Sequence, residues 1–260
     1  MIRRHPIASV VTSLVIALIW VPLLMIAVNA LNRDELLISW GGATTRWFKE
    51  AWNDEQIRDS LMVSIRLAAL ATAISLVVAV TAALFWRGAS PRVRRIIDGA
   101  TIVRIVMPEI VLATALLLLF NKLGLPFGTT AVALGHAVFG SAFATVVIQA
   151  RMHALDPALE EAAADLGATP LRRAWRVTLP LLAPGIVAAG ALAFILSFDD
   201  VITSQFLGDA RENTLPLVVF GIIRQRVTPE ANAIGAIVLL LSAAVTTLVL
   251  VATAFGKRRR

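Results

Sequence analysis

The 260-residue sequence has no cysteine, and charged residues make up only 16% of it. Without cysteine, disulfide frameworks and thiolate metal sites are excluded. The three histidines, His5, His136 and His153, are too scattered to indicate a metal site. The sequence therefore predicts no metal and no cofactor, and its charge content is well below the roughly 25% of ordinary globular domains.

Several catalytic motifs are also missing. The sequence contains no Gly-x-x-x-x-Gly-Lys-Ser/Thr loop for nucleotide phosphates, no Gly-x-Ser-x-Gly elbow and no His-Glu-x-x-His zinc helix. No catalytic residue is predicted. The net charge of +7 comes from basic residues in short loops and at both ends, without the interleaved aromatic residues of nucleic-acid binders. A nucleic-acid partner is therefore not expected.

Long uncharged stretches are the main feature of the sequence, and hydrophobic residues make up 58% of the chain. A helix that crosses a membrane needs about 20 mostly apolar residues, and in lipid such a stretch must satisfy its own backbone hydrogen bonds. We expect an all-α integral membrane protein with six transmembrane helices in a single domain over residues 1–260. The predicted spans are 6–31, 67–86, 102–120, 129–150, 180–198 and 232–255.

The first span has a cleaved signal peptide as its alternative. Arg3 and Arg4 precede it, and the Val28-Asn29-Ala30 segment resembles a cleavage site. Its apolar region is about 25 residues long, however, beyond the usual 7–15 of a signal peptide. The length favours a retained transmembrane helix.

The distribution of basic residues predicts the orientation. With a cytoplasmic N-terminus, 15 of the 24 Lys and Arg residues lie on the cytoplasmic side, although the two longest loops are outside. By the positive-inside rule both termini are cytoplasmic. The outer loop 32–60 carries Trp40, Trp47 and Trp52 among charges, which predicts an amphipathic helix against membrane lipid.

The cytoplasmic loop 151–179 carries signals for a fixed shape. Asp156-Pro157 is a helix start, Ala158 to Leu166 form a short helix, and Gly167 ends it. Thr169-Pro170 starts a second helix that leads to the fifth span. A solvated linker is the alternative, but two capped helices joined by a glycine favour docking into a groove on a partner.

This loop resembles the conserved loop of permeases in ATP-binding-cassette (ABC) importers. The residues that match are Glu161, Ala162, Ala163, Gly167, Leu179 and Pro180, with Val177 before the last two. The resemblance implies that helix 158–166 couples the permease to a separate ATPase. ATP would then be hydrolysed by that partner, and this chain would be no enzyme.

Further segments resemble the second permease subunit of spermidine/putrescine importers. They are Trp47 to Val80, Met107 to Val111, Ser197 to Asp200, Thr214 to Pro216 and Arg224 to Asn232. This implies a polyamine substrate, with phosphonate, iron or sugar as alternatives. It also implies a bacterial inner-membrane location, ABC ATPase subunits, a homologous second permease subunit and an extracytoplasmic substrate-binding protein.

Glu109 is an acid inside the predicted third span. A charge at the bilayer centre costs roughly 2.5–3.5 kcal/mol, and Arg104, five residues earlier, lies off the same helix face. We expect Glu109 to find a partner on another helix, a water-filled path or a proton. Pro108 predicts a kink at this point. A purely structural kink is the alternative to a role in the substrate path.

Asp199 and Asp200 follow the fifth span at its outer mouth, and Phe194 and Phe198 precede them. Paired carboxylates beside aromatic rings suit an organic cation, so Asp199, Asp200, Phe198 and Glu109 are the candidates for the substrate path. An ordinary loop pair or helix cap is the alternative.

Two other classes of membrane protein stay open on the residues alone. A secondary transporter needs an ion-coupling site at mid-membrane, and Glu109 is the one candidate for a proton relay, although no internal repeat is evident. A membrane scaffold or enzyme subunit has no need of a shaped Glu-Ala-Ala loop.

Overall fold

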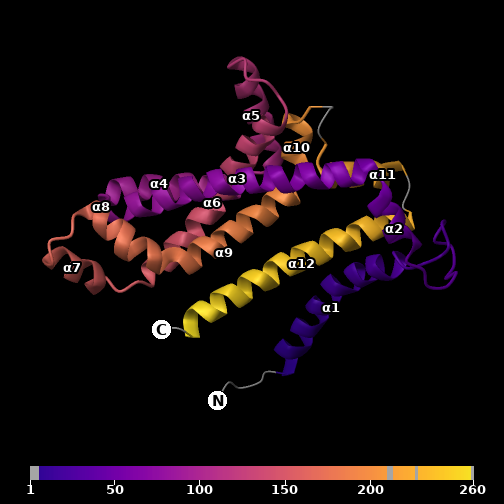
Figure 1. Cartoon of the computed structure of the whole chain (residues 1–260), viewed down its shortest axis with the longest axis horizontal. Helices are drawn as coiled ribbons and strands as arrows, with labels where there is room; N and C mark the ends of the chain where they lie inside the picture. The colour runs from indigo at the N-terminus through magenta and orange to yellow at the C-terminus, as the bar shows by residue number, and fades with distance from the viewer. Residues whose placement is uncertain (1–5, 210–212, 226–227, 259–260) are drawn as a thin grey trace. The chain divides into compact units, whose positions relative to one another are not determined.

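A computed structural model describes residues 6–209, 213–225 and 228–258, with only the backbone at 6–8, 245 and 248–258. Within these ranges the chain is helical apart from loops and one isolated bridge, which confirms the predicted all-α class. The elements, labelled in Figure 1, are α1 (Pro6–Asn29), α2 (Arg46–Asn53), α3 (Glu55–Gly88), α4 (Pro91–Val106), α5 (Glu109–Lys122), α6 (Thr129–His153), α7 (Ala158–Asp165), α8 (Pro170–Arg173), the π-helical segment η1 (Ala174–Thr178), α9 (Leu179–Phe198), α10 (Ile202–Leu207), α11 (Leu215–Gln225) and α12 (Pro229–Arg258).

Four helices are long and apolar enough to cross a membrane. They are Ser9–Asn29 of α1, α3, α6, and the continuous run Pro170–Phe198 that joins α8, η1 and α9. A fifth span is present if the bent pair α4 and α5 counts as one. The predicted sixth span, 232–255, falls on α12, whose side chains are described in part. The described residues thus support four or five spans, and the number six remains a prediction.

The third span differs from its prediction as one helix over 102–120. Helix α4 ends at Val106, α5 begins at Glu109, and the two are bent by 107°. Proline has no backbone N–H and disfavours helical geometry in the residue before it. Met107 is accordingly extended, with φ −63° and ψ 127°. Pro108 therefore breaks the helix instead of kinking it, and Glu109 opens a new helix.

The chain divides into two compact units, which are described separately. The first comprises Met1–Asp59 and Val218–Ser242. The amphipathic helix expected in the outer loop is present as α2, where Trp47 is buried and Trp52 is 61% exposed. The Trp47 indole donates a hydrogen bond of 2.7 Å to the Asn32 carbonyl, so α2 is fixed to the loop that follows α1.

The second unit comprises Ser60–Leu217 and Ala243–Arg260. Helices α6 and α9 pack along each other in it (Figure 1). At Gly140 an added Cβ would meet the Ser75 hydroxyl at 2.7 Å, and at Gly190 it would meet Leu76 at 3.1 Å. Such close approach through small residues is the usual packing of helices in membranes. It fixes α3, α6 and α9, which supply Arg87 and His136 to the two candidate sites.

Candidate functional site

The first candidate is the α7–η1 segment, residues 156–178. The Asp156 side chain accepts a 2.9 Å hydrogen bond from the Ala158 N–H, which confirms the predicted start of α7. Gly167 has φ +78°, a conformation that glycine adopts without strain. Its N–H donates to the Ala164 carbonyl (2.8 Å), and the Ala168 N–H donates to the Ala163 carbonyl (3.0 Å). This is a complete Schellman C-cap, as the glycine predicted.

The second half of the segment is helical and continues directly into α9. Thr169 caps α8 through its side chain, which accepts from the Arg172 N–H. The helix then runs without interruption through η1 into α9, so Leu179 and Pro180 lie inside one continuous helix, Pro170–Phe198. Pro180 has no backbone N–H to donate within this helix, and the π-helical turn η1 lies just before it.

Helix α7 carries an uncovered apolar stripe. None of its residues is buried. Leu159 is 48% exposed and Leu166, its C-cap, is 88% exposed. Together with Ala162 and Ala163, they stand at the i, i+3, i+4 and i+7 spacing of one helix face. A short helix with such a stripe suits insertion into a groove on another protein. The predicted Glu161 lies beside the stripe and is exposed.

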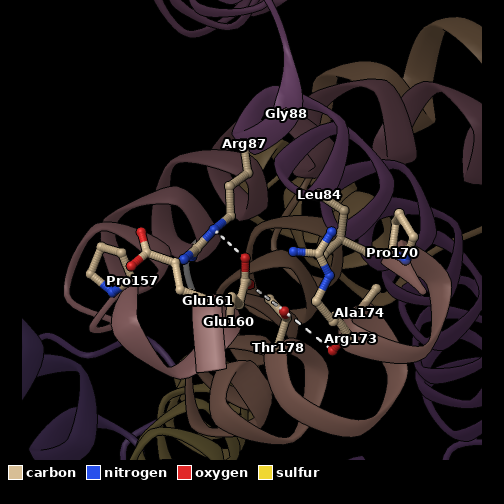
Figure 2. Close-up of a pocket in the computed structure, with 10 residues that line it drawn as sticks. All are labelled: Leu84, Arg87, Gly88, Pro157, Glu160, Glu161, Pro170, Arg173, Ala174 and Thr178. Atoms are coloured by element: carbon tan, nitrogen blue, oxygen red, sulfur yellow. Dashed lines mark hydrogen bonds and ion pairs between the residues drawn. The ribbon is translucent and has the colours of Figure 1, made fainter. Parts of the chain in front are cut away.

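A cleft of about 410 Å³ separates α7 from the helices beside it (Figure 2). Inside it, Arg87 Nε lies 3.0 Å from Glu160 Oε2, and the Thr178 hydroxyl donates to Glu160 Oε1 at 2.5 Å. The residues that line the cleft are Leu84, Arg87, Gly88, Pro157, Glu160, Glu161, Pro170, Arg173, Ala174 and Thr178. Sequence reasoning named Glu161 but missed Glu160, since only the fold shows which of two adjacent acids faces inward.

The second candidate is a buried polar cluster around Asp200, at the start of α10. Asp200 Oδ1 lies 3.3 Å from His136 Nε2 and accepts a 3.1 Å hydrogen bond from the Ser204 N–H. The other ring nitrogen, Nδ1 of His136, lies 2.7 Å from the Ser197 hydroxyl. Asp200 and His136 are 6% and 2% exposed. The Asp200 carboxylate is thus committed to partners within the chain.

The predicted Glu109 joins this cluster, and so does Arg104. The side chains of Glu109 and Asp200 interact electrostatically in this cluster. The Arg104 guanidinium lies 4.5 Å from the Phe139 ring centroid, and its nitrogens have no hydrogen-bond partner among the described residues. Glu109 thus lies near Asp200, a residue of the loop between α9 and α10.

The remaining predicted path residues, Asp199 and Phe198, have different surroundings from Asp200. Asp199 is exposed, whereas Asp200 beside it is buried. Phe198 is 3% exposed and stacks on Phe194, with ring centroids 6.0 Å apart. The adjacent acids thus have different environments, although they are neighbours in sequence.

His136 and Arg104 were missed as members of a site. His136 was considered only as a metal ligand, and the described residues contain no group of three or more His, Asp or Glu side chains that could hold a metal ion. The available signal was its place in the middle of an uncharged span, where an ionisable residue marks a functional or structural partner.

The sequence matches one protein family and is similar to individual transport proteins. Residues 75–260 match the family described as "Binding-protein-dependent transport system inner membrane component". The chain is 34% identical over 243 residues to the putrescine transport system permease protein PotI of Escherichia coli K12, covering 91% of this chain and 86% of that protein. It is 30% identical to the spermidine/putrescine permease PotC of Haemophilus influenzae, covering 90% and 91% of the two chains.

Solved structures support the fold. A bacterial ABC transporter that imports the acidic polysaccharide alginate matches with a TM-score of 0.74 at 16% identity, covering 96% of this chain and 94% of that one. The MetNI methionine ABC transporter matches with a TM-score of 0.63 at 17% identity, covering 76% and 92%.

Proposed function

The chain belongs to the family of binding-protein-dependent transport system inner membrane components, the permeases of ABC importers, and from this premise we propose that it carries a polyamine, putrescine or spermidine, across the bacterial inner membrane. The permease relatives named for putrescine and spermidine, at 34% and 30% identity over nine-tenths of the chain, carry this proposal. Phosphonate, iron or sugar transport are the alternatives that the test must exclude.

The α7–η1 segment is the proposed attachment to the ATPase. The apolar stripe of α7 inserts into a groove of that subunit, and the Schellman cap at Gly167 fixes the angle at which α8 leaves. Glu161, Ala162, Ala163, Gly167, Leu179 and Pro180 are the proposed coupling residues. The uncovered stripe supports this docking, because a helix with no buried residue has its apolar face available for a partner.

The remaining architecture follows from the same proposal. The protein has six spans with both termini in the cytoplasm, and the bent α4–α5 pair and α12 supply the two spans beyond the four long helices. Its partners are a second homologous permease subunit, ATPase subunits that hydrolyse ATP, and an extracytoplasmic binding protein that delivers the substrate.

The proposed substrate path includes Glu109, Asp199, Asp200 and Phe198. Asp199 is the residue that meets the cationic substrate, since its side chain is exposed. Glu109 and Asp200 act together as a second pair of acids, and Phe198, the residue before Asp199, is held in place by stacking on Phe194.

The first experiment measures uptake of labelled putrescine and spermidine in cells with and without the gene, with unlabelled phosphonate, iron and sugar as competitors. Loss of energy-dependent polyamine uptake in the deletion strain is the expected result. If polyamine uptake is unchanged and uptake of another solute is lost, the substrate assignment is wrong.

The same assay tests the path. We expect Asp199→Asn to weaken uptake of spermidine more than that of putrescine, because spermidine carries more positive charge. Asp59→Asn is the matched control, since Asp59 is also an exposed aspartate on the predicted outer side but belongs to α3 and not to the proposed path. Equal effects of Asp199→Asn on both polyamines contradict the contact.

A further inference from the structure

Glu160 joins three elements that are otherwise separate in the chain. It stands in the first turn of α7, and each of its carboxylate oxygens contacts a different element. Oε2 pairs with Arg87 in the last turn of α3, and Oε1 accepts from Thr178 at the end of η1. Figure 2 shows the three side chains converging in the cleft beside α7.

The two contacts are sheltered from solvent. The Arg87 and Glu160 side chains are 22% and 23% exposed, and Thr178 is 2% exposed. The Arg46–Glu50 pair on α2, by contrast, is 56% and 41% exposed. Water screens an exposed pair and competes with it, so sheltered charge-assisted hydrogen bonds hold their partners more firmly.

These contacts matter because α7 has little else to hold it. No residue of α7 is buried, so packing contributes little to holding the helix against the rest of the unit. A helix of eight residues is also too short to be stable alone. Within the described residues, Glu160 is the side chain of α7 that both pairs with a cation and accepts a hydrogen bond.

The Thr178 contact lies at a structurally unusual point. Residues Ala174–Thr178 form a π-helical turn immediately before α9, and Thr178 also approaches the Arg173 carbonyl at 3.5 Å. π-turns occur often at functional sites and are points where helices bend. A displacement of Thr178 therefore acts on the π-helical turn, which is the least regular part of the long helix.

We propose that Glu160 is the positioning residue that ties α7 to the end of α3 and to the π-turn before α9, so that a displacement of α7 moves both transmembrane helices together. This inference rests on the proposed docking of α7 to an ATPase. The inference adds the contacts that link α7 to the transmembrane helices. The contact with Arg87 links α7 to α3, and the contact with Thr178 links α7 to α9.

The test compares uptake with ATP hydrolysis in proteoliposomes that contain the whole transporter with its binding protein. Glu160→Gln removes the ion pair, and Thr178→Val removes the hydroxyl at nearly constant volume. We expect each variant to lower putrescine uptake about tenfold while ATP hydrolysis stays within twofold of wild type, so that more ATP is spent per substrate. Glu50→Gln, which breaks the exposed pair with Arg46, is the matched control and should leave the ratio unchanged.

A charge exchange separates the pair from a general folding defect. The double variant Arg87→Glu with Glu160→Arg should restore at least half of the uptake that Glu160→Gln loses. Uptake per ATP equal to wild type in Glu160→Gln overturns the role of Glu160 while the proposed function stands. A wild-type transporter without ATP-driven polyamine uptake instead contradicts the proposed function.

A second measurement tests the tie without transport. The chain has no cysteine, so a single Asp165→Cys accepts a spin label at the exposed end of α7. The label should become more mobile when Glu160→Gln is added, and not when Glu50→Gln is added. Unchanged mobility in Glu160→Gln shows that α7 is held by other means and overturns the proposal, whatever the transporter carries.

Discussion

The α7–η1 segment and the buried cluster around Asp200 are built in opposite ways. The segment takes its shape from neighbours in sequence: a cap at Asp156, a glycine with positive φ at Gly167, and a second cap at Thr169. The cluster takes its shape from residues far apart, since His136 meets Ser197 and Ser204 across 61 and 68 positions. Contacts between neighbours in sequence leave the segment exposed on the surface, whereas contacts between residues far apart in sequence fix the buried cluster.

The largest effect is expected in the cluster. Asp200→Ala leaves the His136 ring nitrogen and the Ser204 N–H without their carboxylate partner, inside the protein. Leaving a buried donor without its hydrogen-bond partner costs about 1–3 kcal/mol for each group. Thermal unfolding of the purified protein in detergent should therefore begin at a clearly lower temperature.

Asp199→Ala is the matched control, because it removes the same group one residue away at an exposed position. A surface change of this kind alters stability by about 0.5 kcal/mol or less. Equal destabilisation by the two variants would show that burial does not separate these acids.

An intermediate effect is expected at Gly167. A residue with a Cβ in the left-handed region costs about 1–2 kcal/mol, and Val adds the restriction of its branched side chain. Gly167→Val should abolish uptake while membrane insertion, followed by the amount of protein in the membrane fraction, stays normal. Its control is Gly99→Val, since an added Cβ at Gly99 also meets nothing within 4 Å but its φ is ordinary. Normal uptake in Gly167→Val would contradict the docking of α7.

The contrast also explains what the sequence could predict. The starts and ends of α7 and α8 depend on side chains within four residues, so Asp156, Gly167 and Thr169 were sufficient to place them. The helical class and most spans followed from apolar length alone. The break at Pro108 was anticipated in position but not in its 107° angle, because the angle depends on which helices pack against α5.

The partners of Glu109 and Asp200 could not be predicted in the same way. Which residues meet across helices depends on the rotation of α6 against α9, which close contacts at residues such as Gly140 decide. Each of those contacts involves positions far apart in the sequence. The same reason applies to Glu160 and Glu161: adjacent acids on a helix differ by about 100° in direction, and only the position of α3 decides which of them meets Arg87.

The smallest effect is expected at Thr169. Its side chain accepts from the Arg172 N–H at 3.4 Å, a long hydrogen bond. Loss of a helix N-cap costs about 0.5–2 kcal/mol, and the length of this bond places Thr169→Ala near the lower limit. Because caps act locally, hydrogen exchange at the Arg172 amide should accelerate about twofold, while exchange in α6 stays unchanged. Thr169→Ser retains the hydroxyl and should exchange as wild type does. If Thr169→Ala also accelerates exchange in α6, the segment is not shaped locally, and the contrast between the two sites is weaker than their contacts indicate.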